Sequence, residues 1–512
     1  MRSGVTLGAG GVGFDDVLAV ARDDAPVALG DDALAAMERG AAVVAALGDS
    51  AEPAYGISTG FGSLATVRIP DDRREELQRA LIRSHATGMG PPVEREVVRA
   101  MMLLRARSLA MGYSGVRPVV AETLLALLGA GITPVVPEHG SLGASGDLAP
   151  LAHCALVLIG EGVVEGPDGV RVEAAGPLAA AGIEPLTLEA KEGLALINGT
   201  DGMLGMLVLA CADLLALLRA AEIAAAMSVE ALLGTDRAFA ADLVGLRPQP
   251  GQGLSAANLR RLLADSQIVA SHRFGDPRVQ DAYSLRCAPQ VTGAARDTLS
   301  HARGVADFEL RAAIDNPMVL PDGRVESCGN FHGAPVGYAC DFLAIAAADV
   351  GAIAERRTDR LLDAGRSHGL PPFLAEEPGV NSGLMLAQYS QAAMVAETRR
   401  LAVPASVDSL PTSAMQEDHV SMGWGAARKL RRSLENLARI VAVEVVCAAR
   451  GLDLRGPLRP APGTAAALAC VRSRVPGFGP DRFLAPELAA AEELVRSGAL
   501  VRAVEGAVGP LD

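Results

Sequence analysis

The chain contains few aromatic residues and no closely spaced cysteine pairs. Only 3% of its 512 residues are aromatic, so a large core must be built mainly from Ala, Leu and Val, which favours closely packed helices. Its seven cysteines are scattered without Cys-x-x-Cys spacing, a distribution typical of reduced thiols in a cytoplasmic protein. We therefore expect a helical, cytoplasmic protein without a disulfide framework.

The chain also has fewer basic than acidic residues, with 46 Lys and Arg against 60 Asp and Glu. The net charge of -14 argues against nucleic acid or an anionic membrane surface as the main partner. The N-terminal MRSGVTLGAGG lacks the apolar core of a secretion signal. Apolar runs such as 203–212 are cut by charged residues before they reach the ~18 residues of a membrane span. The eight histidines show no paired ligand spacing, so we expect no metal site.

The pattern of apolar residues changes near residue 200. Residues 1–200 are mixed and rich in Gly and Pro, whereas residues 201–512 are strongly helical. Sparse charges in the long helices suit a bundle or an oligomer interface. We predict a mainly α protein with a long-helix bundle core, a mixed N-terminal part and these Ala/Leu-rich helices: 207–233, 340–364 and 427–453.

Short glycine-containing motifs interrupt the helical pattern. Pro-Asp-Gly turns between β-prone runs predict hairpins at 163–173 and 319–327. Gly8, Gly10 and Gly13 match the dinucleotide-binding spacing GxGxxG. Because only a short strand precedes them and no β-α-β pattern follows, we expect no dinucleotide site there.

The stretch GSLGASGDLAPLAH (140–153) places small residues in a row before an apolar run. If the chain bends tightly, the Gly146 nitrogen can approach the Ala144 carbonyl carbon, because glycine has no Cβ. Ring closure with loss of one water molecule would give a five-membered imidazolone. Loss of a second water molecule from the Ser145 side chain would leave an exocyclic methylene, which is a strong electrophile. An ordinary turn is the commoner explanation of the tripeptide alone, but the longer string is far more specific.

Together with other motifs, this stretch resembles the aromatic amino acid ammonia-lyases. Members of that family carry 4-methylidene-imidazol-5-one (MIO), formed autocatalytically from Ala-Ser-Gly. The resemblance implies a MIO from Ala144-Ser145-Gly146 in the mixed part, no external cofactor, and a homotetramer with active sites at subunit junctions. The matching motifs follow the family's order: AYGISTGFG (54–62), LIRSHATGMG (81–90), GSLGASGDLAP (140–150), EGLALINGT (192–200), VQDAYSLRCAPQ (279–290), SCGNFHG (327–333), NSGLMLAQY (381–389) and MQEDHVSMG (415–423).

The resemblance also assigns roles to single residues. Tyr55 is the implied base for the substrate's β-proton, which requires surroundings that favour phenolate. Arg286 is the implied clamp for the substrate carboxylate, a task that suits the guanidinium fork. Without the family context, a turn tyrosine and a surface arginine are the ordinary explanations of these two residues.

Further polar residues and one aromatic residue belong to the implied site. Asn198, Gln280 and Tyr283 resemble residues that orient the substrate and the MIO carbonyl, with Tyr283 counted among the catalytic residues. Ordinary buried hydrogen bonds are the alternative for these three. Phe331 is expected to pack beside the MIO ring, with a plain core position as its alternative.

The implied substrate depends on a few positions. This chain has Ser84-His85, the histidine pattern, where phenylalanine and tyrosine relatives have Phe-Leu and His-Leu. The second position is Glu417, which follows Gln416. The phenylalanine and tyrosine relatives carry Gln in place of Glu417. A buried carboxylate needs a cation or a donor, which an imidazole supplies and a phenyl ring does not.

We therefore expect a carbon–nitrogen lyase that converts L-histidine to trans-urocanate and ammonia, the first step of histidine degradation. The electrophile makes the amine a leaving group, while Tyr55 removes the β-proton. One departure from the family is Met415, where many relatives have Asn. The alternatives are another MIO-dependent aromatic amino acid ammonia-lyase, a 2,3-aminomutase, or an inactive helical scaffold.

Overall fold

A computed structural model describes residues 4–48, 59–60 and 67–512. Contacts divide the chain into two compact units. The first comprises Met1–Leu209, Arg303–Asp341 and Pro404–Arg428, and the second comprises Ala210–Ala302, Phe342–Val403 and Lys429–Asp512. Because each unit is assembled from separated segments, the units do not follow the chain in two consecutive halves. The expected division at residue 200 stays a prediction.

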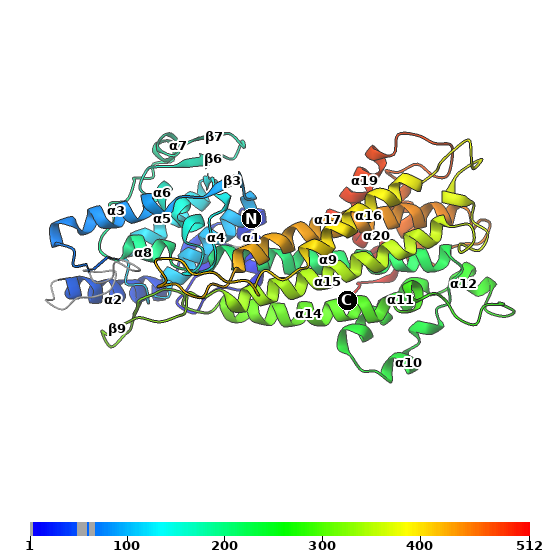
Figure 1. Ribbon diagram of the computed structural model, residues 1–512, viewed down its shortest axis with the longest axis horizontal. Helices are drawn as coiled ribbons and strands as arrows, with labels where there is room; N and C mark the ends of the chain where they lie inside the picture. Colours follow the sequence, from blue (N-terminus) through cyan, green and yellow to red (C-terminus); the bar gives the residue numbers. More distant parts are fainter. Residues whose placement is uncertain (1–3, 49–58, 61–66) are drawn as a thin grey trace. The chain divides into compact units, whose positions relative to one another are not determined.

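Long helices dominate the structure, as the apolar composition predicts. The three segments expected to be helical are α9, α15 and α17, and each begins a few residues earlier than the sequence suggested. With α14 they form the long helices of Figure 1: α9 (Asp201–Ala231), α14 (Ala288–Glu309), α15 (Ala334–Leu362) and α17 (Gly423–Asp453). The mainly α fold class is therefore confirmed.

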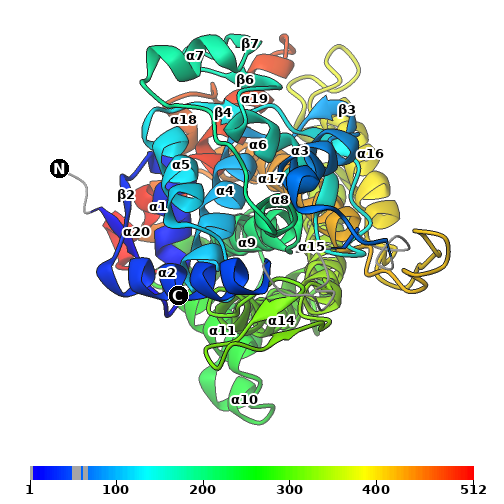
Figure 2. The ribbon, with the colours of Figure 1, turned by 90° about the vertical axis from the view of Figure 1, so that its left-hand side faces the viewer.

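The first unit contains short helices and small sheets. Helices α1, α4 and α5 pack together, and α3, α6 and α8 form a second group of mutual contacts (Figure 2). The helices are α1 (Phe14–Asp23), α2 (Asp31–Gly48), η2 (Asp71–Arg73), α3 (Arg74–His85), α4 (Arg95–Ala110), α5 (Pro118–Gly129), α6 (Leu148–Leu158), α7 (Ala175–Ala180) and α8 (Glu192–Ile197). The strands are β1 (Val5–Leu7), β2 (Val27–Leu29), β3 (Met89–Pro92), β4 (Thr133–Pro134), β5 (Pro137–His139), β6 (Val163–Glu165), β7 (Arg171–Glu173), β8 (Met318–Val319) and β9 (Val325–Glu326).

Both predicted hairpins are present. Strand β6 pairs antiparallel with β7, and β8 pairs antiparallel with β9. In each case the Pro-Asp-Gly turn lies between the two strands, where glycine supplies the positive φ that the turn requires, as at Gly169 and Gly323. The turn chemistry was therefore sufficient to locate both hairpins.

The expectation that no β-α-β unit follows the GxGxxG motif is wrong. Strand β1 pairs parallel with β2, and α1 connects them. The strands are only three residues long, too short for alternation to register in the sequence. The loop nevertheless uses its N–H groups internally, since Ala9 N donates to Asp32 (2.9 Å) and Gly13 N to Asp16 (2.9 Å). Two N–H groups of the loop are therefore bonded to carboxylates of the chain itself.

In the second unit the long helices are joined by buried charged side chains. The Glu444 carboxylate on α17 accepts hydrogen bonds from Arg357 on α15 (2.9 Å) and Ser228 on α9 (2.7 Å). Glu222 on α9 pairs with Arg296 on α14 at 2.8 Å. The unit's other elements are η3 (Arg237–Phe239), α10 (Ala241–Gly245), α11 (Pro250–Leu263), α12 (Gln267–Ser271), α13 (Tyr283–Arg286), η4 (Pro372–Leu374), α16 (Met385–Leu401), α18 (Pro462–Arg472), α19 (Ala485–Arg496) and α20 (Ala499–Val508).

Two apolar segments are longer and more apolar than expected: Glu192–Ala231, which spans α8 and α9, and Ala334–Leu362, which is α15. By length and composition each could cross a membrane. Of their most apolar windows, 72% and 56% are buried. Because core helices of soluble proteins meet the same criterion, length and composition do not assign these segments to a membrane.

Candidate active site

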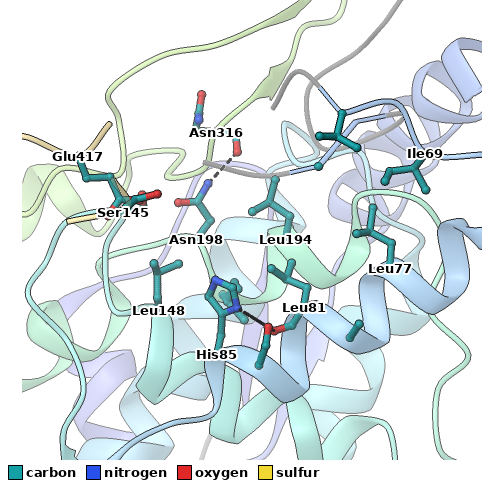
Figure 3. Close-up of a pocket in the computed structure, with 16 residues that line it drawn as sticks. Ile69, Leu77, Leu81, His85, Ser145, Leu148, Leu194, Asn198, Asn316 and Glu417 are labelled. Atoms are coloured by element: carbon teal, nitrogen blue, oxygen red, sulfur yellow. Dashed lines mark hydrogen bonds between the residues drawn. The ribbon is translucent and has the colours of Figure 1, made fainter. Parts of the chain in front are cut away.

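A cavity of about 550 Å³ in the first unit brings together side chains from separate segments of the chain. His85, Ser145, Asn198 and Glu417 all line it. Figure 3 shows Ser145, Asn198 and Glu417 near one another, with Leu148 below Ser145 and further aliphatic side chains to the right of Asn198: Ile69, Leu77, Leu81 and Leu194. The cavity therefore offers a polar region beside an apolar one, as small-molecule sites do. Within the described ranges, no three His, Cys, Asp or Glu side chains gather as metal ligands would.

Packing of α3, α6 and α8 explains how these segments meet. His85 ends α3, Ser145 lies shortly before α6, and Asn198 directly follows α8. The Gln78 side chain of α3 accepts hydrogen bonds from the Gly193 and Leu194 N–H groups of α8, at 2.9 and 3.3 Å. This contact fixes the helix that carries His85 against the helix that leads to Asn198.

The Ala144-Ser145-Gly146 segment lies in a loop that only small residues can form. Gly143 and Gly146 have φ values of +67° and +76°, in the left-handed region that favours glycine. A Cβ on Gly146 would lie 2.1 Å from the Gly199 carbonyl oxygen, and one on Gly143 would lie 2.0 Å from Ser421 Oγ. The backbone is therefore closely surrounded, as a segment that must react with itself requires.

Asp147 directly follows the tripeptide and fixes the loop by hydrogen bonds. It was not among the residues predicted for the site. Its carboxylate is buried and accepts hydrogen bonds from Ser141 Oγ (2.9 Å) and Met203 N (2.9 Å). Its own N–H donates to the Gly199 carbonyl at 2.7 Å. Burial, opposed in part by these hydrogen bonds, raises the pKa of Asp147 to about 7. The only signal in the sequence was its place directly after the tripeptide.

The imidazole of His85 is oriented by its own helix. Its Nδ1 lies 2.9 Å from the Leu81 carbonyl oxygen and 3.1 Å from Ser84 Oγ. A carbonyl oxygen only accepts, so this contact assigns a hydrogen to Nδ1. In the neutral ring Nε2 is then the acceptor.

Glu417 reaches the cavity from a loop before α17. Its Oε2 accepts a hydrogen bond from Thr412 Oγ1 at 2.8 Å, and the two residues also form an antiparallel backbone bridge. The side chain is half-buried. Gln416 and Met415 beside it are exposed, and Met415 has a φ of +70°. Asn tolerates that region better than most residues, including Met.

The remaining expected residues lie elsewhere or outside the described residues. Tyr55 falls outside them. Phe331 is half-buried in the loop before α15. In the second unit, Tyr283 is 71% exposed, and the Arg286 guanidinium lies 4.5 Å from the centre of its ring. Gln280 lines a different cavity, of about 500 Å³, in that unit. Their roles stay predictions.

Known proteins resemble this chain over nearly its whole length. The family model "Aromatic amino acid lyase" matches residues 12–473. The sequence is 62% identical to histidine ammonia-lyase from Streptomyces avermitilis, over 99% of both chains, and 52% identical to that from Gloeobacter violaceus, over 97% of both. Among solved structures, tyrosine aminomutase from Streptomyces globisporus matches with a TM-score of 0.94 and 38% identity, over 100% of both chains. The structure of histidine ammonia-lyase from Trypanosoma cruzi matches with a TM-score of 0.91 and 39% sequence identity, over 99% of this chain and 96% of that chain.

Proposed function

The chain belongs to the aromatic amino acid lyase family, and we propose that it is a histidine ammonia-lyase, which converts L-histidine to trans-urocanate and ammonia. It is accordingly a carbon–nitrogen lyase. The observation that carries the proposal is that Ser145, His85 and Glu417 line one cavity. The same cavity thus holds the residue for the electrophile and two residues suited to an imidazole ring.

The electrophile in this proposal is MIO, formed from Ala144-Ser145-Gly146. Two features of the loop fit that group: the positive φ of Gly146, and the carbonyl of Gly199, which leaves no room for a Cβ there. Once formed, the group supplies an electrophilic methylene for the substrate's amine. The surrounding hydrogen bonds of Asp147 hold the loop that bears it.

Recognition of the imidazole ring is assigned to His85 and Glu417. The half-buried Glu417 carboxylate gains a favourable partner when an imidazole N–H donates to it. His85 Nε2 is a second acceptor, so the two groups together suit the imidazolium form of the ring, which carries an N–H at each nitrogen. A phenyl ring has no donor for either group, which favours histidine over phenylalanine.

The other site residues complete the proposal by family resemblance. Tyr55 is the base for the β-proton, and Arg286 binds the substrate carboxylate. Asn198, Gln280, Tyr283 and Gln416 orient the substrate, and Phe331 packs beside the reacting group. We further propose a cytoplasmic homotetramer without nucleic acid or membrane partners. Exposed Phe342 and Ile345, which line a groove of about 530 Å³ in the second unit, support the assembly.

A direct test compares the wild-type protein with Ser145→Ala. The wild type should produce urocanate from L-histidine, measured by its ultraviolet absorbance, and its intact mass should be lower than the sequence mass by two water molecules. Ser145→Ala should lose both properties, because it lacks the hydroxyl that leaves. Substantial activity in that variant would contradict the MIO assignment.

The structural similarity to a tyrosine aminomutase supports one competing function. An aminomutase would move the amine to the β-carbon, so its product from an aromatic amino acid would be a β-amino acid and not the free acrylate. Incubation with L-tyrosine and L-histidine, followed by chromatography of the products, separates the two functions. An inactive scaffold would yield neither product and would keep the full sequence mass.

A further inference from the structure

The carboxylate of Asp315 connects both ends of helix α8. On one side, Lys191 Nζ lies 2.7 Å from Asp315 Oδ2. On the other, Asn198 Nδ2 lies 3.3 Å from Asp315 Oδ1. Lys191 directly precedes α8 and Asn198 directly follows it. All three side chains are buried, with Lys191 fully so. The ion pair is therefore part of the wall that supports Asn198.

These contacts determine which way the Asn198 amide faces. Its Nδ2 donates to the Asn316 carbonyl (2.7 Å) as well as to Asp315, so both amide hydrogens are used. A reversed amide would place Oδ1 against two acceptors, which repel it. Because Asp315 Oδ1 also accepts from Asn316 N at 2.7 Å, one carboxylate orients both neighbours.

This orientation leaves the amide oxygen of Asn198 on the side of Ser145 in the view of Figure 3. Asn198 is only 2% exposed, and its Oδ1 has no hydrogen-bond partner among the described residues. The residue lines the cavity together with Ser145 (Figure 3). A buried acceptor without a partner is unfavourable, and a ligand with an N–H donor would satisfy it.

A buried ion pair is a weak source of stability, because desolvation offsets the attraction between its charges. Orientation of a neighbouring group is a more specific role for Lys191 and Asp315. The Lys191 ammonium neutralises the carboxylate and fixes its rotation, and the carboxylate in turn fixes the Asn198 amide. Arg105 Nη1 holds the backbone of Asn198 by a 2.9 Å bond to its carbonyl oxygen.

We propose that Lys191 and Asp315 are positioning residues that present the Asn198 amide oxygen to the ammonium group of the amino acid substrate. An ammonium group has only donors, whereas a carboxylate would be repelled by the same oxygen. The position agrees with Ser145 in the same cavity, since the amine must reach the electrophile there. This inference rests on the proposed function.

The test measures binding without turnover, in a Ser145→Ala background. Lys191→Met should weaken the binding of L-histidine about tenfold, the expected loss of a hydrogen bond to a charged group. Binding of trans-urocanate, which lacks the amine, should stay within about twofold. Isothermal titration calorimetry provides both dissociation constants. Equal weakening of both ligands, or unchanged binding of both, would overturn the inference.

Two further variants separate positioning from loss of structure. Arg296→Met breaks another buried ion pair, in the second unit, and should leave the ratio of the two dissociation constants unchanged. In an Asn198→Ala background, Lys191→Met should cause no additional loss of L-histidine binding, because the two residues act as one unit. An additive loss contradicts the inference.

Folding and substrate identity are controlled separately. If circular dichroism shows Lys191→Met unfolded, the charge-free pair Lys191→Gln with Asp315→Asn replaces it in every arm, with the same expected and contradicting results. If Ser145→Ala alone binds neither L-histidine nor trans-urocanate, the proposed function fails, and this inference fails with it. If the Ser145→Ala protein binds both ligands but Lys191→Met does not selectively weaken the binding of L-histidine, only the positioning role is refuted.

Discussion

Replacement of Glu417 by Gln provides the sharpest test of substrate choice, because it removes a charge and keeps the shape of the side chain. Glu417 Oε2 already accepts from Thr412. Among the described residues Thr412 is the carboxylate's hydrogen-bond partner, so Oε1 is the oxygen available to a ligand. The substrate imidazole is therefore expected to make one hydrogen bond to Glu417, not two.

That geometry sets the size of the effect. A hydrogen bond to a charged group contributes about 1.5–3 kcal/mol and a neutral one about 0.5–1.5 kcal/mol. Glu417→Gln should thus lose about 1–2 kcal/mol of transition-state stabilisation, which corresponds to about a 5- to 30-fold lower kcat/KM for L-histidine. The neutral amide should also exclude a phenyl ring less strongly, so discrimination against L-phenylalanine should fall.

The assay follows urocanate and cinnamate absorbance for the two substrates, with thermal unfolding measured on each variant. Thr412→Val is the matched control, since it removes the hydroxyl donor and leaves the carboxylate in place; its loss should be smaller. Glu173→Gln, on exposed β7, should have no effect. If Glu417→Gln keeps kcat/KM for L-histidine within twofold of wild type, Glu417 does not bind the imidazole.

Other predictions concern the loop and its surroundings. Gly146→Ala should prevent MIO formation, detected as an undiminished intact mass, because its Cβ would lie 2.1 Å from the Gly199 carbonyl. The pKa of Asp147 is raised from 3.8 to about 7 in the folded state, so its contribution to stability is full below pH 3.8 and is lost as pH rises through 7. The wild type should lose up to about 4 kcal/mol relative to Asp147→Asn over that range, measured by urea unfolding. Met415→Asn should raise the free energy of unfolding by about 1 kcal/mol, since Asn tolerates the φ of +70° there.

Features with a local cause were predictable from the sequence. The hairpins follow from Pro-Asp-Gly turns, and the long helices follow from extended Ala/Leu-rich segments with few charges. The parallel pair of β1 and β2 was not predictable, because three-residue strands carry no measurable alternation. Helix starts were placed late, since the first turns of α9, α15 and α17 lie in motifs that resemble loops.

The site was predictable only by family resemblance. His85, Ser145, Asn198 and Glu417 come from four segments, and no periodicity relates positions so far apart. Lys191 and Asp315 were missed because an isolated lysine and aspartate are ordinarily surface residues, and only the folded chain buries them as a pair. The strained backbone at Met415 was equally invisible in the sequence.

Three polar side chains that line the cavity are each oriented by a hydrogen bond within the protein. His85 is held by the carbonyl of Leu81, and Glu417 by Thr412. Asn198 is held by Asn316. A site whose groups are already oriented loses little entropy when the substrate binds. Substitution of the supporting groups should therefore cost more transition-state stabilisation, calculated from kcat/KM, than free energy of unfolding. This pattern distinguishes a preorganised site from ordinary core packing.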